Sequence, residues 1–239
     1  MASRAMEGSP EVAMAGDDAA PRLRYFVDPV SFLTHCVGAV AAIGGLVYLV
    51  TDPRAIGARL VTNAIYGATL VGMLSASSIY HFFDPGPRGK RWLRRMDHTA
   101  IFLLIAGTYL PPLVHALDGA WRVSMIAVVG GLALFGVAFK LFWINCPRWL
   151  SAGIYLALGW IVVIPAAKIF PVMPGWSTFW LVVGGLFYTV GAIIYARKWP
   201  NPYPGRFGFH EIWHLFVLGG AGSHFIFVTT FLDQSYAPF

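Results

Sequence analysis

Long uncharged stretches alternate with short polar segments along this chain of 239 residues. Seven stretches contain no Asp, Glu, Lys or Arg, and each is near the roughly 20 residues that an α-helix needs to cross a bilayer. The alternating ten-residue strands of a membrane barrel are absent from the pattern. The sequence therefore predicts an all-α integral membrane bundle of seven transmembrane helices. The predicted spans are Pro29–Thr51, Leu60–Phe83, His98–Leu117, Val123–Phe139, Trp149–Ala167, Ile169–Ala196 and Ile212–Leu232.

The first 27 residues have a different composition. They are rich in Gly, Ser, Pro and acidic residues and lack the apolar core of a signal peptide. We predict a disordered cytoplasmic tail over residues 1–27, followed by a transmembrane domain over residues 28–239.

Residues at three places in the chain predict local departures from regular spanning helices. The fourth span is short unless its helix continues past Lys140 to Trp143, with the Lys140 side chain reaching the membrane interface. Pro111-Pro112 and Pro165 are expected to bend or end the third and fifth helices.

The basic residues predict an orientation. If the segments between spans alternate sides, 13 of the 17 Lys and Arg residues fall on the side of the N-terminus and four on the other side. Because basic residues accumulate in cytoplasmic loops, the N-terminus should lie in the cytoplasm and the C-terminus outside. The four residues on the outer side are Arg54, Arg59, Arg122 and Lys168.

Composition agrees with a membrane location. Hydrophobic residues make up 57% of the chain and charged residues 12%, whereas soluble domains carry about 25% charged residues. A soluble enzyme and a disulfide-rich secreted module are therefore excluded, and Cys36 and Cys146 predict no disulfide framework. The net charge of +6 indicates loops that face anionic lipid and not a nucleic-acid partner. We expect a multi-pass protein of the cell membrane.

Candidate chemistry lies at three helix ends. His210 and His214, spaced i and i+4 at the start of the seventh span, lie on one face and can reach one metal ion. Ser77 and His81 share a face at the end of the second span, and Asp97 directly precedes the third. The predicted topology places all three helix ends at one depth, near the cytoplasmic face.

Ionisable groups at membrane depth are costly and indicate function. Three imidazoles plus a carboxylate or water form a metal site with an open position, as in catalytic zinc sites. Asp97 would bind the metal, hold a water or act as a base, and Ser77 would steady that water or a substrate oxygen. The alternative is that the histidines are hydrogen-bonded structural anchors. The residues alone do not decide between a metal site and structural anchors.

The other histidines and Cys146 are weaker candidates. His35 starts the first span on the same side and could support a ligand, whereas His98 should point about 100° away from Asp97. His224 lies about 15 Å deeper than His214, so we expect it to hydrogen-bond a neighbouring helix. His115 faces the opposite side, and Cys146 should be an inert loop residue.

These motifs resemble the hemolysin III family, the bacterial branch of the progestin and adiponectin-Q receptor group, within a superfamily that includes alkaline ceramidases. The likeness covers nearly the whole chain after the tail. It rests on Ser-x3-His, on Asp97, on His-x3-His, on the segment Lys90–His98 with Ala106–Tyr109, and on Asp28–His35. The resemblance implies Zn2+ bound by His81, His210 and His214, with Asp97 and Ser77 completing the site around a water.

Three functions remain open at this point. A zinc-dependent hydrolase of lipid amides would use membrane lipid as its substrate, with Asp97 relaying the proton. A pore-forming or cytolytic protein would need a polar helix face across the whole membrane, and only the second span shows part of one. A receptor or membrane-state sensor would use the same zinc structurally. A retinal protein is excluded, because the last span contains no lysine.

Overall fold

The computed structural model describes residues 24–234. The predicted tail lies outside the described residues up to residue 23, whereas residues 24–27, also assigned to it, are structured. The α-helices are α1 (Pro29–Thr51), α2 (Gly57–Phe82), α3 (Gly86–Ala116), α4 (Gly119–Phe142), α5 (Arg148–Gly159), α6 (Ala166–Ile169), α7 (Gly175–Arg197) and α8 (Phe209–Gln234). The short elements are strands β1 (Arg24–Tyr25) and β2 (Phe83–Asp84) and 3-10 turns η1 (Trp160–Val163) and η2 (Phe170–Val172).

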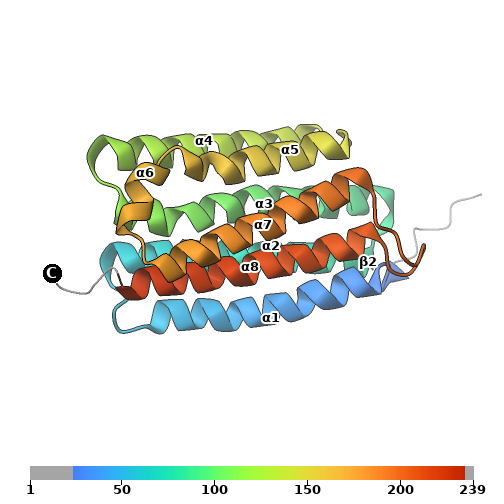
Figure 1. Ribbon diagram of the computed structural model, residues 1–239. Coiled ribbons are helices and arrows are strands. Elements are labelled where there is room, and N and C mark those ends of the chain that lie inside the picture. The colour runs from blue at the N-terminus through green and yellow to red at the C-terminus, as the bar shows by residue number, and fades with distance from the viewer. Residues whose placement is uncertain (1–23, 235–239) are drawn as a thin grey trace, which may run out of the picture.

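The fold is an all-α membrane bundle, as the sequence predicts. Within the described residues, six helices are long and apolar enough to cross a membrane. A seventh span is present if Arg148–Val163 and Ala166–Val172, which meet at an angle of 42°, are counted together. The break falls at Pro165, where we expected the fifth helix to bend, because proline cannot donate the helical hydrogen bond. β1 and the end of α8 lie at opposite ends of the bundle, as an odd number of spans requires (Figure 1).

Helix α3 is longer than the uncharged span His98–Leu117 predicts, because it begins at Gly86 and includes the basic segment before Asp97. The helix does not end at Pro111 and Pro112 but continues to Ala116. Both prolines are buried inside the bundle, where packing against other helices can tolerate proline within a spanning helix.

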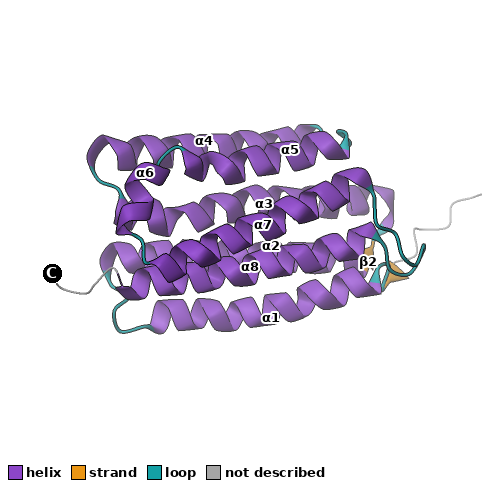
Figure 2. Ribbon diagram, viewed as in Figure 1, coloured by secondary structure: helices purple, strands orange, loops and turns teal. Residues whose placement is uncertain are grey.

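Helices that follow one another in the chain lie side by side. α1 packs on α2, α2 on α3, α3 on α4 and α7 on α8, and α1 also contacts α8, so the first and last of these helices lie side by side. Figure 1 shows α1 at one edge and α4 with α5 at the other, and Figure 2 shows how little of the described chain is strand or loop. Small residues bring α7 and α8 close, since Gly219 and Gly220 lie directly against the rings of Phe187 and Tyr188.

The outer surface of the bundle is apolar. Val37, Leu134 and Phe135 are each more than 60% exposed, whereas Phe102 and Leu113 inside the bundle are fully buried. A surface with apolar side chains of this size exposed along several helices is stable in lipid and not in water.

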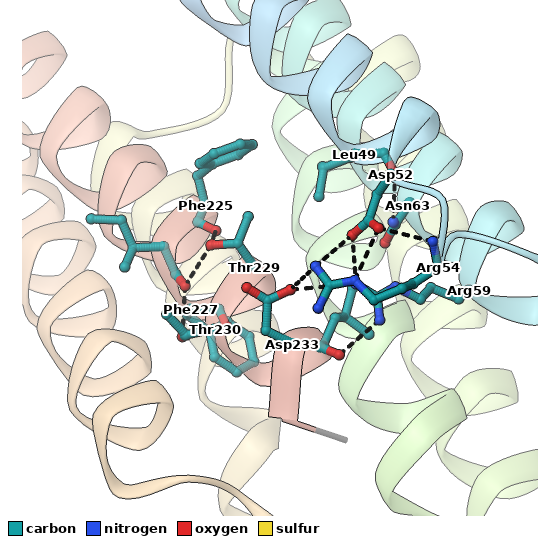
Figure 3. Close-up of polar contacts among 12 residues, drawn as sticks. Leu49, Asp52, Arg54, Arg59, Asn63, Phe225, Phe227, Thr229, Thr230 and Asp233 are labelled. Carbon is teal, nitrogen blue, oxygen red and sulfur yellow. Dashed lines mark hydrogen bonds and ion pairs between the residues drawn. The ribbon is translucent and has the colours of Figure 1, made fainter. Parts of the chain in front are cut away.

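An ion-pair cluster closes the end of the bundle that carries the loop between α1 and α2 (Figure 3). Asp52 contacts the guanidinium groups of Arg54 at 2.9 Å and Arg59 at 3.0 Å. Arg54 also pairs with Asp233 at 2.7 Å, and Arg59 donates to the carbonyl of Leu232. The cluster therefore holds the last turn of α8 against the α1–α2 loop.

The position of the Lys140 side chain differs from the one that we expected. The helix α4 continues past it to Phe142, but the Lys140 side chain is 1% exposed and does not reach the interface. It points into the bundle, where its ammonium donates to Cys146 and Ser151.

Candidate metal centre

Three histidines from two helices meet at the end of the bundle opposite the ion-pair cluster. His81 lies in the last turn of α2, and His210 and His214 lie in the first two turns of α8. Each histidine offers one possible ligand atom, and these three atoms all lie within 4.8 Å of one another. Helix α1 lies beside both α2 and α8, and the α1–α2 and α1–α8 contacts hold the two helix ends together.

A residue that sequence reasoning did not single out orients His81. Nδ1 of His81 donates to Oδ2 of Asp28 at 3.0 Å, and the backbone N–H of Asp28 donates to the carbonyl of His81 at 3.1 Å. The β1–β2 ladder brings Asp28 to this position, because β2 directly follows α2 and β1 directly precedes α1. Burial raises the pKa of Asp28 and is the largest single effect, but the contacts with His81 and Ser31 and the nearby His210 together outweigh it and hold this pKa below its ordinary value.

His214 is oriented in a similar way by His35 of α1. Nδ1 of His214 lies 2.8 Å from Nε2 of His35, and both side chains are buried. When Nδ1 of His214 donates this hydrogen bond, its Nε2 keeps a lone pair that faces His210. His35 therefore contacts a candidate ligand, as expected for a residue that could support one.

Asp97 and Ser77 lie beside the three histidines. Asp97 on α3 is 8% exposed, its carboxylate accepts a hydrogen bond from the hydroxyl of Ser77 on α2, and Nδ1 of His98 lies 3.9 Å from its Oδ2. Among the described residues, the histidine group does not include Asp97. The carboxylate lies beside the three histidines and is not one of the three candidate ligands that form the group.

A cavity of about 300 Å³ extends from this group into the bundle. Its walls are mostly apolar and come from α1, α2, α3, α5, η1, α6, η2, α7 and α8. Asp97 and Pro112 of α3 both line it, and 15 residues of helix span roughly 22 Å. The cavity is thus long enough for an extended apolar chain with a polar group at the histidine end.

The remaining histidines stay outside the group of three. His224 lines the cavity deeper in the bundle and contacts the Leu181 carbonyl of α7 at 3.2 Å, as the expected interhelical hydrogen bond requires. His98 lines the same cavity, with its Nδ1 3.9 Å from Asp97. His115 contacts Thr62 near the other end.

The three imidazoles lie close enough together to hold one metal ion, with one ligand atom from each within 4.8 Å of the others. Nε2 of His214 and Nε2 of His210 are 3.3 Å apart, and two nitrogen ligands on one tetrahedral zinc lie about 3.4 Å apart. Nε2 of His81 is buried and has no hydrogen-bond partner among the described residues. A buried nitrogen without a partner is costly unless it binds something. The residues present therefore fit a divalent metal ion.

Comparison with known proteins agrees with these observations. A family model described as haemolysin-III related matches residues 24–225, which include all five candidate residues. A hemolysin-3 homolog of Bacillus subtilis is 33% identical over 198 residues, covering 82% of this chain and 90% of the relative. Hemolysin-3 of Bacillus cereus is 32% identical, with 82% and 87% covered.

A more distant match links the chain to animal receptors. The adiponectin receptor protein of Drosophila melanogaster is 28% identical over 213 residues, which cover 80% of this chain and 48% of the receptor. The fold, the shared span of residues and the bacterial relatives give one answer: the chain is a multi-pass membrane protein that belongs to the haemolysin-III related family.

Proposed function

We propose that this protein is a zinc-dependent hydrolase that cleaves lipid amides within the membrane, with zinc held by His81, His210 and His214. The observation that carries the proposal is the unpartnered, buried Nε2 of His81, which lies beside His210 and His214, two imidazoles that line the polar end of a long apolar cavity. A purely structural histidine cluster would pair its buried nitrogens with one another or with the backbone.

Each residue has a role in this proposal. A zinc ion held by three histidines supplies a Lewis acid for the scissile carbonyl and lowers the pKa of a water towards about 7. Asp97 accepts the proton of the attacking water and passes it to the leaving amine. Ser77 donates its single hydroxyl proton to the Asp97 carboxylate and holds it in place, and its oxygen can accept a hydrogen bond from the attacking water. Asp28 and His35 hold the imidazoles of His81 and His214 in the required orientation.

The cavity favours a lipid as the substrate. Its apolar walls accept an acyl chain, whose burial contributes about 0.8 kcal/mol per CH₂ group. Ser77 and Asp97 line the cavity at the same end as the imidazoles of His210 and His214. The bond to be cleaved would lie at this end. Exclusion of bulk water by the bundle strengthens the electrostatic interactions at that bond.

The orientation is also a proposal. The basic residues at the histidine end of the bundle include Arg91, Arg94 and Arg148, and their excess supports a cytoplasmic location for this end. The zinc site would then lie near the cytoplasmic face of the cell membrane, at the depth of the bonds that join acyl chains to headgroups.

Incubation of the purified, zinc-loaded protein with ceramides and other N-acyl amides tests the activity. Free fatty acid measured by mass spectrometry should accumulate with the wild type and not with the protein stripped of metal by a chelator. If the zinc-loaded protein releases no fatty acid from any lipid amide, the hydrolase proposal fails.

The bacterial relatives favour a second candidate, since two of them are named hemolysins. A cytolytic pore needs a polar path across the bilayer, and the cavity found here has mostly apolar walls. Release of a trapped dye from liposomes that contain the purified protein would support the pore, and retained dye together with fatty-acid release would support the hydrolase. A receptor without turnover, the class named by the Drosophila relative, would show neither.

A further inference from the structure

A second buried polar cluster lies where α4 ends and α5 begins, outside the histidine group. Nζ of Lys140 lies 3.1 Å from Sγ of Cys146 and also donates to Oγ of Ser151. Sγ and Oγ are 3.0 Å apart, so the three groups contact one another. Lys140 is 1% exposed, and Cys146 and Ser151 are each 5% exposed.

The partners of Lys140 are unusual for a buried amine. A buried ammonium is normally paired with a carboxylate, because an isolated charge is costly to remove from water. None of the ion pairs among the described residues involves Lys140. The Lys140 amine instead contacts the thiol of Cys146 and the hydroxyl of Ser151. A proton can move among these three groups.

We propose that Lys140 and Cys146 form a reversible sulfur–nitrogen cross-link when a peroxide oxidises the protein. The Cys146 sulfur attacks one oxygen of hydrogen peroxide, the O–O bond breaks, and a sulfenic acid and water form. The Lys140 nitrogen then attacks the sulfur, the S–O bond breaks, and the hydroxyl leaves as water with a proton from the amine. Sulfur is oxidised, peroxide is reduced to two waters, and the protein loses two hydrogen atoms.

The geometry favours this second step over the usual fates of a sulfenic acid. The amine is already in contact with the sulfur, so ring closure needs no large movement. Ser151 donates to the departing oxygen, and burial keeps larger thiols such as glutathione away from the sulfur. A thiol reductant small enough to enter would restore the amine and the thiol.

The cross-link would affect the wall of the cavity. It would join the last turn of α4 to the loop that leads into α5, and α5 contributes Ala152 and Tyr155 to the cavity wall. Oxidation would thereby fix the start of α5, which links the redox state of the cell to a segment next to the candidate site.

Peptide mapping of the full-length protein tests the proposal. Hydrogen peroxide should convert residues 123–148 into one tryptic peptide that lacks cleavage after Lys140 and is lighter by two hydrogens, and dithiothreitol should reverse both changes. Lys140→Met should abolish the product and leave a Cys146 sulfenic acid that a dimedone reagent traps. Cys36→Ser removes the other cysteine, which is half-buried on α1, and should leave the product unchanged.

Two results would overturn the proposal, and neither requires a variant to fold. One is a wild-type Cys146 that gains oxygen atoms while trypsin still cleaves after Lys140. The other is a Cys146 that stays reduced at peroxide concentrations that oxidise Cys36.

Discussion

The carboxylate of Asp28 and the imidazole of His81 are joined by a hydrogen bond of 3.0 Å between Oδ2 and Nδ1. This contact fixes the tautomer of His81 with its proton on Nδ1, so that Nε2 is free to bind a metal. Asp28 lies before α1 and His81 at the end of α2, and the β1–β2 ladder holds the two together. The segment directly before α1 therefore belongs to the candidate site.

Replacing Asp28 by alanine should weaken zinc binding without removing a ligand. Loss of a carboxylate that orients a histidine ligand typically lowers metal affinity by about 10- to 100-fold. Competition with a fluorescent zinc chelator measures the affinity. Asp118→Ala is the matched control, because Asp118 is an exposed carboxylate before α4 at the other end of the bundle, and it should bind zinc as the wild type does. Equal affinities in the two variants would show that Asp28 does not orient His81.

Asp97→Asn separates a catalytic zinc from a structural one. Asparagine is close in size and can hydrogen-bond Ser77, but it cannot accept a proton. Zinc content and melting temperature should barely change, while fatty-acid release should fall by about 10²–10⁴-fold. Loss of zinc in this variant would mean that Asp97 binds the metal, and wild-type activity would end its role as the base.

The ion-pair cluster at the other end of the bundle predicts a dependence of stability on pH. Hydrogen bonds from Arg54 lower the pKa of Asp52 to about 2. The ionised form of Asp52 stabilises the folded state, so its contribution is complete above the ordinary value near 3.8 and is lost as the pH falls through about 2.

Asp52→Asn should therefore melt at a lower temperature than the wild type at pH 6, by a few degrees, and the difference should disappear near pH 2. Thermal unfolding in a nonionic detergent at several pH values measures it. A difference that grows as the pH falls would contradict the assignment.

The orientation predicts opposite locations for the two ends of the chain. A reporter that is active only in the cytoplasm should work when fused before Met1 and fail when fused after Phe239. A cytoplasmic signal from the fusion at Phe239 would exclude the cytoplasmic N-terminus, an odd number of spans, or both.

Much of this arrangement could be predicted from the sequence, because bilayer thickness imposes a simple length rule on uncharged stretches. The spacing of His210 and His214 places both on one helix face, and helix direction brings His81 and Asp97 to the same depth. Helix ends were predicted less well. The third span was predicted to begin at His98 because the preceding residues are charged, although Arg and Lys are good helix formers and side-chain charge does not prevent helix formation outside the hydrocarbon.

The supporting contacts needed the structure. Asp28 is joined to His81 by a two-residue ladder between segments nearly 60 residues apart, and strands of that length leave no periodic signal. Lys140 was expected at the interface because long basic side chains usually reach water. The alternative partners, Cys146 and Ser151, follow in the next loop and helix, and their position depends on a turn that hydropathy does not specify.

Zinc content of the purified protein is the most direct test of the central claim. The wild type, measured by inductively coupled plasma mass spectrometry after removal of loosely bound metal, should contain about one zinc per chain. The double variant His210→Ala, His214→Ala should contain almost none, whereas His115→Ala, which changes a histidine at the other end of the bundle, should retain it. Equal zinc in the wild type and the double variant, or no zinc in the wild type after loading, would contradict the metal site at these residues.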